Sequence, residues 1–135
     1  MITAVDTSVL IDVFGADARF GAHSANALRV SLNEGAVVAC GVVWSETRAA
    51  FASDEAFLQA LRTLGIGFSA LTEPAATLAG ISWKKYRASE GKRERVMADF
   101  LIGAHAATQC DRLLTRDRGY FKKYFSGLAI VDPSA

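Results

Sequence analysis

The chain has 135 residues, of which 51% are hydrophobic and 21% are charged, and its formal net charge is +1. This length and composition are typical of one globular domain with a substantial core, and they exclude an intrinsically disordered protein. The sequence has no apolar run long enough to span a bilayer, and its first residues lack the basic flank and cleavage site of a signal peptide. We therefore expect a single domain over residues 1–135, no membrane partner and a cytoplasmic location.

Apolar runs and helix signals alternate along the chain. The apolar runs predict strands at residues 2–6, 36–40, 68–71, 112–115 and 128–131. Capping residues, glycines and prolines bound the predicted helices, which cover residues 7–14, 22–34, 43–52, 53–65, 74–88, 96–110 and 118–124, with loops at 15–21 and 89–93. Continuously apolar strands that alternate with helices predict an α/β fold, with a mainly parallel sheet of about four to five strands covered on both faces.

The cysteines and histidines give no sign of a metal site built on sulfur or imidazole. Cys40 ends a predicted strand and Cys110 lies on the apolar side of a predicted helix, so we expect two small buried thiols rather than a disulfide. His23 and His105 are far apart and lack metal-ligand spacing, so we expect solvated or locally hydrogen-bonded rings.

Two aspartates follow runs that predict buried strands. Asp6 comes directly after the first run and Asp117 closely follows residues 112–115. Ligands of a parallel sheet bind outside the carboxyl ends of its strands, where both aspartates would lie. A carboxylate there is costly to keep ionised alone, whereas several are stable around a cation. Metal-dependent chemistry is therefore the first hypothesis, and a helix N-cap is the alternative role for Asp6.

Further acids lie on the helices between these two. Glu46 follows the second predicted strand, and Asp99 lies in the most apolar predicted helix, where a charge is expected to have a partner. The alternatives are a surface position beside Arg48 for Glu46 and an arginine pair for Asp99. Asp12 lies six residues after Asp6. It is therefore roughly 240° around the helix, and we expect it to face solvent or a basic neighbour.

Basic residues concentrate in residues 84–123. This segment holds 11 of the 15 lysines and arginines against five acids, a net charge of +6, and Tyr86, Tyr120, Phe121 and Tyr124 are interleaved with them. Such a segment is suited to a polyanion such as nucleic acid, and ordinary solvated helix faces are the alternative.

Four segments together carry a resemblance to a known family. They are residues 5–12, 45–46, 98–106 and 114–121, and they occur in this order across the whole chain. The chain resembles a PIN-domain ribonuclease and, within that family, a VapC-type toxin of a toxin–antitoxin pair. The resemblance implies a PIN-like α/β/α sandwich and a metal-dependent endoribonuclease that hydrolyses RNA phosphodiester bonds with metal-activated water.

The resemblance also assigns roles to individual residues. It implies that the metal-binding and catalytic acids are Asp6, Glu46, Asp99 and Asp117. Oxygen ligands select hard cations, so Mg²⁺ or Mn²⁺ is expected rather than zinc. Supporting or substrate-contacting roles are expected for Ser8, Thr115 and Arg116. Arg116 belongs to a basic cluster that could hold phosphates or a partner's acids, and whose other members are Arg118, Lys122 and Lys123.

Partners and competing functions complete the expectations. The family implies an antitoxin protein and a homodimer, with apolar positions for such contacts in the helices that carry residues 22–32 and 51–64. A haloacid-dehalogenase-type phosphatase needs a second aspartate where this chain has Ser8, and a response-regulator receiver needs neighbouring acids after the first strand, which are missing. A PIN nuclease without an antitoxin and a non-catalytic nucleic-acid-binding module remain the alternatives.

Overall fold

A five-stranded sheet forms the centre of the computed structural model, which describes residues 1–90 and 96–134. Its strands are β1 (Ile2–Val5), β2 (Ala36–Cys40), β3 (Ile66–Ser69), β4 (Arg112–Leu114) and β5 (Ala129–Val131). They are ordered β3-β2-β1-β4-β5, and every neighbouring pair is parallel. The predicted α/β fold with a parallel sheet is therefore confirmed.

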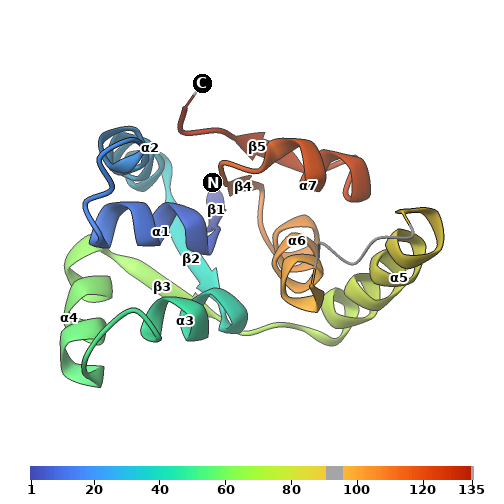
Figure 1. Cartoon of the computed structure of the whole chain (residues 1–135), viewed down its shortest axis with the longest axis horizontal. Coiled ribbons are helices and arrows are strands. Elements are labelled where there is room, and N and C mark those ends of the chain that lie inside the picture. The colour runs from blue at the N-terminus through green and yellow to red at the C-terminus, as the bar shows by residue number, and fades with distance from the viewer. Residues whose placement is uncertain (91–95, 135) are drawn as a thin grey trace.

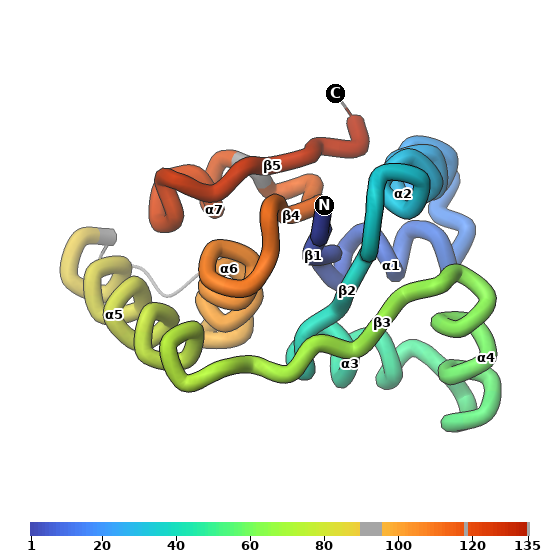
Figure 2. The backbone as a smooth tube through the Cα atoms, turned by 180° about the vertical axis from the view of Figure 1, so that it is seen from behind, coloured from blue at the N-terminus to red at the C-terminus, as the bar shows by residue number. Residues whose placement is uncertain are grey.

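Helices cover both faces of this sheet. They are α1 (Thr7–Phe14), α2 (Gly21–Glu34), α3 (Gly41–Arg48), α4 (Asp54–Leu64), α5 (Glu73–Glu90), α6 (Met97–Gln109) and α7 (Arg118–Tyr124). Right-handed crossovers place helices on opposite faces when the chain moves across a sheet in opposite directions. Accordingly, α1, α2 and α4 lie on one side of the sheet, and α5, α6 and α7 lie on the other (Figures 1 and 2). Between them, α3 contacts both α1 and α6.

The core forms where these layers meet the sheet. Ala4 and Val5 of the middle strand are buried, as expected for a strand covered on both faces. From one side α1 contributes Leu10, and from the other side α6 and α7 contribute Phe100 and Phe121, which are among the largest fully buried side chains. The carboxyl end of β1 is therefore held rigidly in the middle of the molecule.

The predicted elements are present, with shifted ends. The strand predicted at 68–71 is β3 and begins earlier, because Gly65 adopts a left-handed conformation with φ 81° that ends α4 immediately before the strand. The helix predicted at 43–52 is α3, which begins directly after β2. The loop predicted at 89–93 is wrong for residues 89 and 90, because α5 continues to Glu90, and its other residues lie outside the described ones.

An aromatic cluster joins α5, α6 and α7. Its centre is Phe100, whose ring centroid lies 5.4 Å from those of Tyr86 and Tyr120 and 5.8 Å from that of Tyr124. Tyr86, Tyr120 and Phe121 are buried. The prediction that the interleaved aromatic residues are available to bind nucleic acid is therefore wrong for these three, because their rings pack between helices.

The thiols and histidines have structural surroundings. Cys40 is a buried free thiol, as expected, whereas the free thiol of Cys110 is only partly buried. Burial raises the pKa of the Cys110 thiol to about 11. His105 is buried and its Nε2 lies 2.8 Å from Oγ of Ser69, whereas His23 is exposed. Within the described part of the chain, every helix is too short or too polar to cross a membrane.

Candidate active site

The strand order places a crevice between β1 and β4. From β1 the chain first moves to β2 on one side, and it later returns to β4 on the other side. Connections that leave neighbouring strands in opposite directions open a crevice at the carboxyl edge of a parallel sheet, where ligands of α/β proteins bind. Val5 pairs with Leu114 in the sheet register, and the next residue, Asp6, donates its backbone N–H to the carbonyl of Leu114 at 3.0 Å. Asp6 therefore lies at this crevice.

Asp6 is held by a set of short hydrogen bonds. As the N-cap of α1, it accepts a bond from the backbone N of Thr7 to Oδ1 at 2.7 Å. Its Oδ2 accepts bonds from Oγ1 of Thr115 at 2.7 Å and from Oγ of Ser8 at 3.4 Å. The capping role considered from the sequence is thus real, but the carboxylate also faces the crevice.

The electrostatic surroundings of Asp6 disfavour its charge. Burial raises the pKa of Asp6 above its ordinary value of 3.8, and the hydrogen bonds from Thr115 and Thr7 lower it in part. The charges of Asp99 and Glu46 raise the pKa further. A carboxylate in this position is stabilised by any cation that enters the crevice.

Glu46 and Asp99 come from two helices that contact each other, α3 and α6. Oε1 of Glu46 accepts a 2.7 Å hydrogen bond from Oγ1 of Thr7. Asp99 is the third residue of α6, and its Oδ2 accepts a bond of 3.4 Å from the backbone N of Val96. Its occurrence in an apolar helix therefore has a local cause as well, because an acid in the first turn interacts favourably with the helix dipole.

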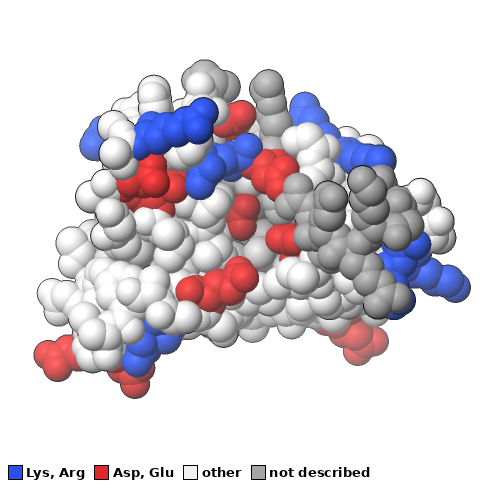
Figure 3. All heavy atoms as spheres, viewed as in Figure 1, with Lys and Arg blue, Asp and Glu red and all other residues white. Residues whose placement is uncertain are grey.

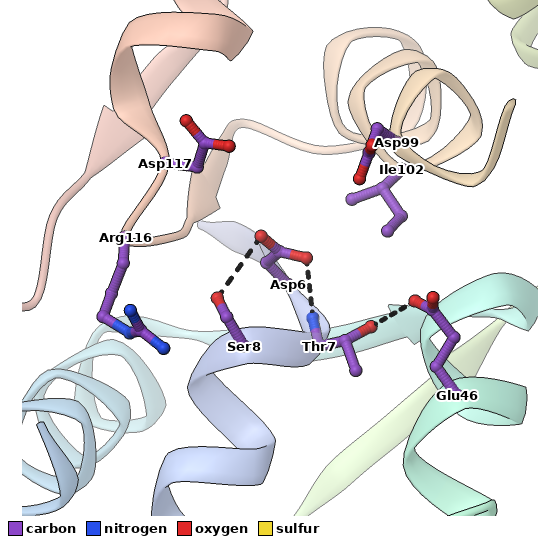
Figure 4. A pocket seen from close by; sticks show the side chains of 8 residues that line it. All are labelled: Asp6, Thr7, Ser8, Glu46, Asp99, Ile102, Arg116 and Asp117. Carbon is purple, nitrogen blue, oxygen red and sulfur yellow. Dashed lines mark hydrogen bonds between the residues drawn. The ribbon is translucent and has the colours of Figure 1, made fainter. Parts of the chain in front are cut away.

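All four expected acids line one pocket. Its volume is about 490 Å³, and its walls are formed by Asp6, Thr7, Ser8, Glu46, Asp99, Ile102, Arg116 and Asp117. Figure 4 shows the four carboxylates around a common space, each carried by a different element or loop. Figure 3 shows acidic side chains gathered across the middle of this face. Thr115, the remaining expected residue, is fully buried and reaches the site through its bond to Asp6.

The donor chemistry of this pocket fits a hard divalent cation. All the charged ligands on its walls are carboxylates, and oxygen ligands favour Mg²⁺ or Mn²⁺. Burial is the main cause of the raised pKa of Asp6, and the charges of Asp99 and Glu46 add to it, so a cation would favour ionised Asp6 here. The carboxylates surround the space without closing on one point: in residues 1–90 and 96–134, no three His, Cys, Asp or Glu side chains are grouped as ligands of one ion.

The comparison with known families decides the identity of this fold. The family model of the PIN domain matches residues 3–125. The chain belongs to the PIN domain family. No curated protein sequence matches it.

Solved structures of low sequence identity share the fold of this PIN domain. VapBC2 from Rickettsia felis bound to a promoter DNA fragment gives a TM-score of 0.74 at 14% identity, with 98% of both chains covered. VapBC-1 from nontypeable Haemophilus influenzae gives 0.73 at 19% identity over the full length of both chains. VapC20 from Mycobacterium tuberculosis, a sarcin-ricin loop cleaving toxin, gives 0.64 at 19% identity, with 97% of this chain and 99% of that chain covered.

Solvent or a basic neighbour was expected beside Asp12 from the sequence, and in the PIN domain it is a basic neighbour. Only 4% of the Asp12 side chain is exposed, and it is paired with Arg116 through a 2.7 Å contact between Nε and Oδ2. The expected basic neighbour is therefore real, and the solvent alternative is wrong. The helical angle predicts correctly that Asp12 points away from Asp6, but it cannot predict that Arg116 covers that side of α1.

The rest of the basic segment is divided among several places in this PIN domain. Arg112 lies on β4, where its Nε donates to Oγ1 of Thr3 at 2.9 Å and its Nη1 lies 3.4 Å from Oε2 of Glu34. It therefore supports the fold and does not line the acidic pocket. Three other basic positions of this segment lie outside the described residues, namely Lys92, Arg93 and Arg95.

Two residues of the pocket, Thr7 and Ile102, were missed by the sequence reasoning. Thr7 lies between the two singled-out residues Asp6 and Ser8, and its hydroxyl holds Glu46 of α3. The signal available in the sequence was its position as the first residue of α1, from which a side chain points toward the carboxyl edge of the sheet. Its partner Glu46 is 39 positions away, which local spacing does not reveal.

Proposed function

We propose that this PIN domain is a metal-dependent endoribonuclease and the toxin of a toxin–antitoxin pair, which arrests growth or translation by cutting RNA. The observation that carries the proposal is the gathering of four carboxylates from separate segments around one pocket at the carboxyl edge of the sheet. Four converging charges destabilise a fold unless they bind a cation, so a purely structural role does not account for them. Membership of the PIN family and the likeness to VapBC structures support the same function.

Each acid has a defined role in this proposal. Asp6, Glu46, Asp99 and Asp117 hold Mg²⁺ or Mn²⁺, which when bound lowers the pKa of water and neutralises charge on the phosphate. Thr7 and Thr115 orient Glu46 and Asp6 through their hydroxyl groups. Ser8 lies at the pocket wall next to Asp6, where it can contact substrate. The chain needs no side-chain nucleophile, since the attacking group is water.

Cleavage of total cellular RNA by the purified chain tests the activity. We expect Mg²⁺- or Mn²⁺-dependent endonucleolytic products that EDTA abolishes. Each of the substitutions Asp6→Asn, Glu46→Gln, Asp99→Asn and Asp117→Asn should abolish cleavage while the protein stays folded by circular dichroism. Glu55→Gln is the matched control, since Glu55 is an exposed acid on α4 away from the pocket. Wild-type protein that leaves RNA intact, or acid variants that cut normally, would contradict the proposal.

An antitoxin partner is the second part of the proposal. An RNase in a cell must be restrained, and several structures with the same fold are toxin–antitoxin complexes. An apolar groove between α1, α2 and α4 offers a contact surface, lined by Val13, Ala25, Leu28, Arg29, Leu32, Thr63 and Leu64. It joins the two helices named from the sequence as candidate contact elements.

Expression of the chain alone, compared with its co-expression with a candidate antitoxin, tests the toxin role. We expect growth arrest by the wild type and relief by co-expression, with Asp99→Asn harmless in both cases. Soluble, folded wild-type protein that leaves growth unchanged would remove the toxin role and leave a PIN nuclease without an antitoxin.

We also propose a homodimer formed through apolar helix faces. Light scattering after size exclusion should give twice the chain mass of 14.4 kDa, and a monomer at high concentration would contradict it.

A further inference from the structure

Arg116 is fixed at the edge of the acidic pocket by two neighbours, Asp12 and Phe20. Its Nε and Nη2 donate to the two carboxylate oxygens of Asp12 at 2.7 and 3.1 Å. Its guanidinium lies 4.1 Å from the ring centroid of Phe20. Oδ2 of Asp12 also accepts a 2.9 Å bond from Oγ of Ser24 on α2. A guanidinium held along one edge and one face keeps a single orientation, and Nη1 takes no part in the pair.

The loop that carries Phe20 is itself ordered. The backbone N–H groups of Arg19 and Phe20 donate to Oδ1 of Asp17 at 2.9 and 2.8 Å, and these bonds lower the pKa of Asp17. The backbone N of Asp17 in turn donates to the carbonyl of Asp12 at 2.9 Å. The stacked ring is therefore positioned by the same segment that supplies the carboxylate.

Stability alone gives a weak reason for this arrangement. Only 4% of the Asp12 side chain is exposed, against 31% for Arg116. Burying a carboxylate costs several kcal/mol of desolvation, and a well-packed apolar pair is often as stable. Two hydrogen bonds to a buried carboxylate instead hold the partly exposed partner in a precise orientation. Arg116 is that partner, and it lines the acidic pocket.

The negative charge of the pocket indicates which kind of ligand Arg116 binds. Among the described residues that line the pocket, Arg116 is the only cation beside four carboxylates (Figure 4). An RNA strand carries one negative charge on every phosphate. The phosphates that neighbour the scissile one are also repelled by the four carboxylates, but they have no metal ion beside them. A guanidinium is well suited to binding such a phosphate, because its planar set of donors matches the phosphate oxygens.

We infer that Arg116 binds a backbone phosphate of the RNA next to the scissile one, and that Asp12 and Phe20 are positioning residues for it. The inference rests on the proposed ribonuclease function and adds a subsite to it. The contact is to the phosphate and not to a base, so it holds the strand at the acids without selecting sequence. Asp12 acts through Arg116 and touches no substrate itself.

The salt dependence of RNA binding tests this subsite. The parent protein is Asp99→Asn, chosen to prevent cleavage, and the probes are labelled single-stranded oligo(U) and oligo(A) measured by fluorescence anisotropy in Mg²⁺ at several salt concentrations. The test variant adds Asp12→Asn and Arg116→Gln, which leaves the net charge unchanged and no buried carboxylate unpaired. The matched control adds Arg48→Gln and Asp54→Asn, which neutralise an ion pair of the same 2.7 Å length outside the pocket.

Loss of one phosphate contact should reduce the slope of log affinity against log salt by about 0.7. We expect this reduction in the test variant, equally for oligo(U) and oligo(A), with no change in the control. An unchanged slope in a folded test variant overturns the subsite, as does a loss confined to one of the two probes. If the test variant does not fold, Arg116→Lys decides: it keeps the charge and the slope but should bind more weakly, and parent-like affinity overturns the inference.

The same measurements separate this subsite from the ribonuclease proposal. Wild-type cleavage together with an unchanged slope in the test variant removes only the subsite. A wild type that does not cleave RNA and a parent that does not bind it remove both. In the wild-type background, Asp12→Asn should raise KM more than it lowers kcat, because it loosens Arg116 without changing the four acids.

Discussion

Thr115 donates a 2.7 Å hydrogen bond from Oγ1 to Oδ2 of Asp6, joining the ends of the neighbouring strands β4 and β1. The same hydroxyl accepts a 3.0 Å bond from the backbone N of Asp117. One buried side chain thus orients the acid that follows β1 and the loop that carries the acid after β4. A single hydroxyl group therefore links two segments whose acids are far apart in the sequence.

Thr115→Val should damage both stability and activity. Valine keeps the shape but removes the donor to Asp6 and the acceptor for Asp117, so we expect a loss of about 1–3 kcal/mol in the free energy of unfolding. The pKa of Asp6 should rise further, because a hydrogen bond that lowers it is gone. Cleavage should fall by about 10- to 100-fold, as is typical when the partner of a metal ligand is removed. Urea unfolding and an RNA cleavage assay measure the two effects.

Thr115→Ser and Thr108→Val are the controls for this change. Serine keeps the hydroxyl, so cleavage should recover most of the wild-type rate. Thr108 lies exposed on α6, where its hydroxyl donates to the carbonyl of Ala104 in the preceding turn. Its replacement by valine should leave cleavage unchanged. Wild-type behaviour of Thr115→Val would show that the bond to Asp6 is dispensable.

Gly103→Ala should destabilise the protein although alanine is the better helix former. A Cβ at Gly103 would lie 2.3 Å from Cε2 of Phe125, whose buried ring packs directly on the α6 backbone. Overpacking of this kind costs about 1–3 kcal/mol. Gly80→Ala on α5 is the matched control, since its Cβ meets nothing within 4 Å. It should stabilise by up to about 1 kcal/mol through helix propensity. Thermal and urea unfolding distinguish the two, and equal effects would contradict this packing argument.

The sequence predicted the placement of the acids better than their surroundings. Asp6 and Asp117 could be placed because a buried strand of a parallel sheet ends at a known edge. That rule needs only the apolar run and the position of the acid after it. The gathering of Glu46 and Asp99 beside them depended on the family resemblance, since α3 and α6 meet through packing that no local pattern encodes.

The contacts that escaped prediction join distant segments. Asp12 and Arg116 are 104 positions apart, so the helical angle of Asp12 could not reveal its partner. Tyr86 and Tyr120 looked like nucleic-acid contacts because the residues beside them are basic, but helix faces place neighbours in the sequence on different sides. Their rings point into the core around Phe100, while the charges point outward.

His105 should make stability depend on pH in the weakly acidic range. Burial lowers the pKa of His105 below its ordinary value of 6.5, so the folded state binds fewer protons than the unfolded chain. Its contribution to stability is complete above pH 6.5 and is lost as the pH falls from there toward the folded-state pKa. Urea unfolding across this range should show a smaller decline for His105→Gln than for the wild type. His23→Gln, which changes an exposed ring, should follow the wild type, and three coincident profiles would rule out a role for His105.

Divalent metal should stabilise this chain, and Asp6→Asn should remove most of that effect. The raised pKa of Asp6 means that the folded state favours its neutral form, so ionisation of Asp6 lowers stability as the pH rises above 3.8. In EDTA at neutral pH, Asp6→Asn should therefore melt at a higher temperature than the wild type, and asparagine still serves as an N-cap.

With Mg²⁺ or Mn²⁺ the order should reverse. A ligand at 100 times its Kd stabilises by about 2.7 kcal/mol, which the wild type should show as an increase in Tm and Asp6→Asn should largely lack. Glu55→Gln, the exposed acid on α4, should respond to metal like the wild type. Thermal scans in EDTA and in increasing Mn²⁺ measure all three proteins. A wild type whose Tm is unmoved by millimolar Mn²⁺ would show that the pocket does not bind the metal on which the proposed cleavage depends.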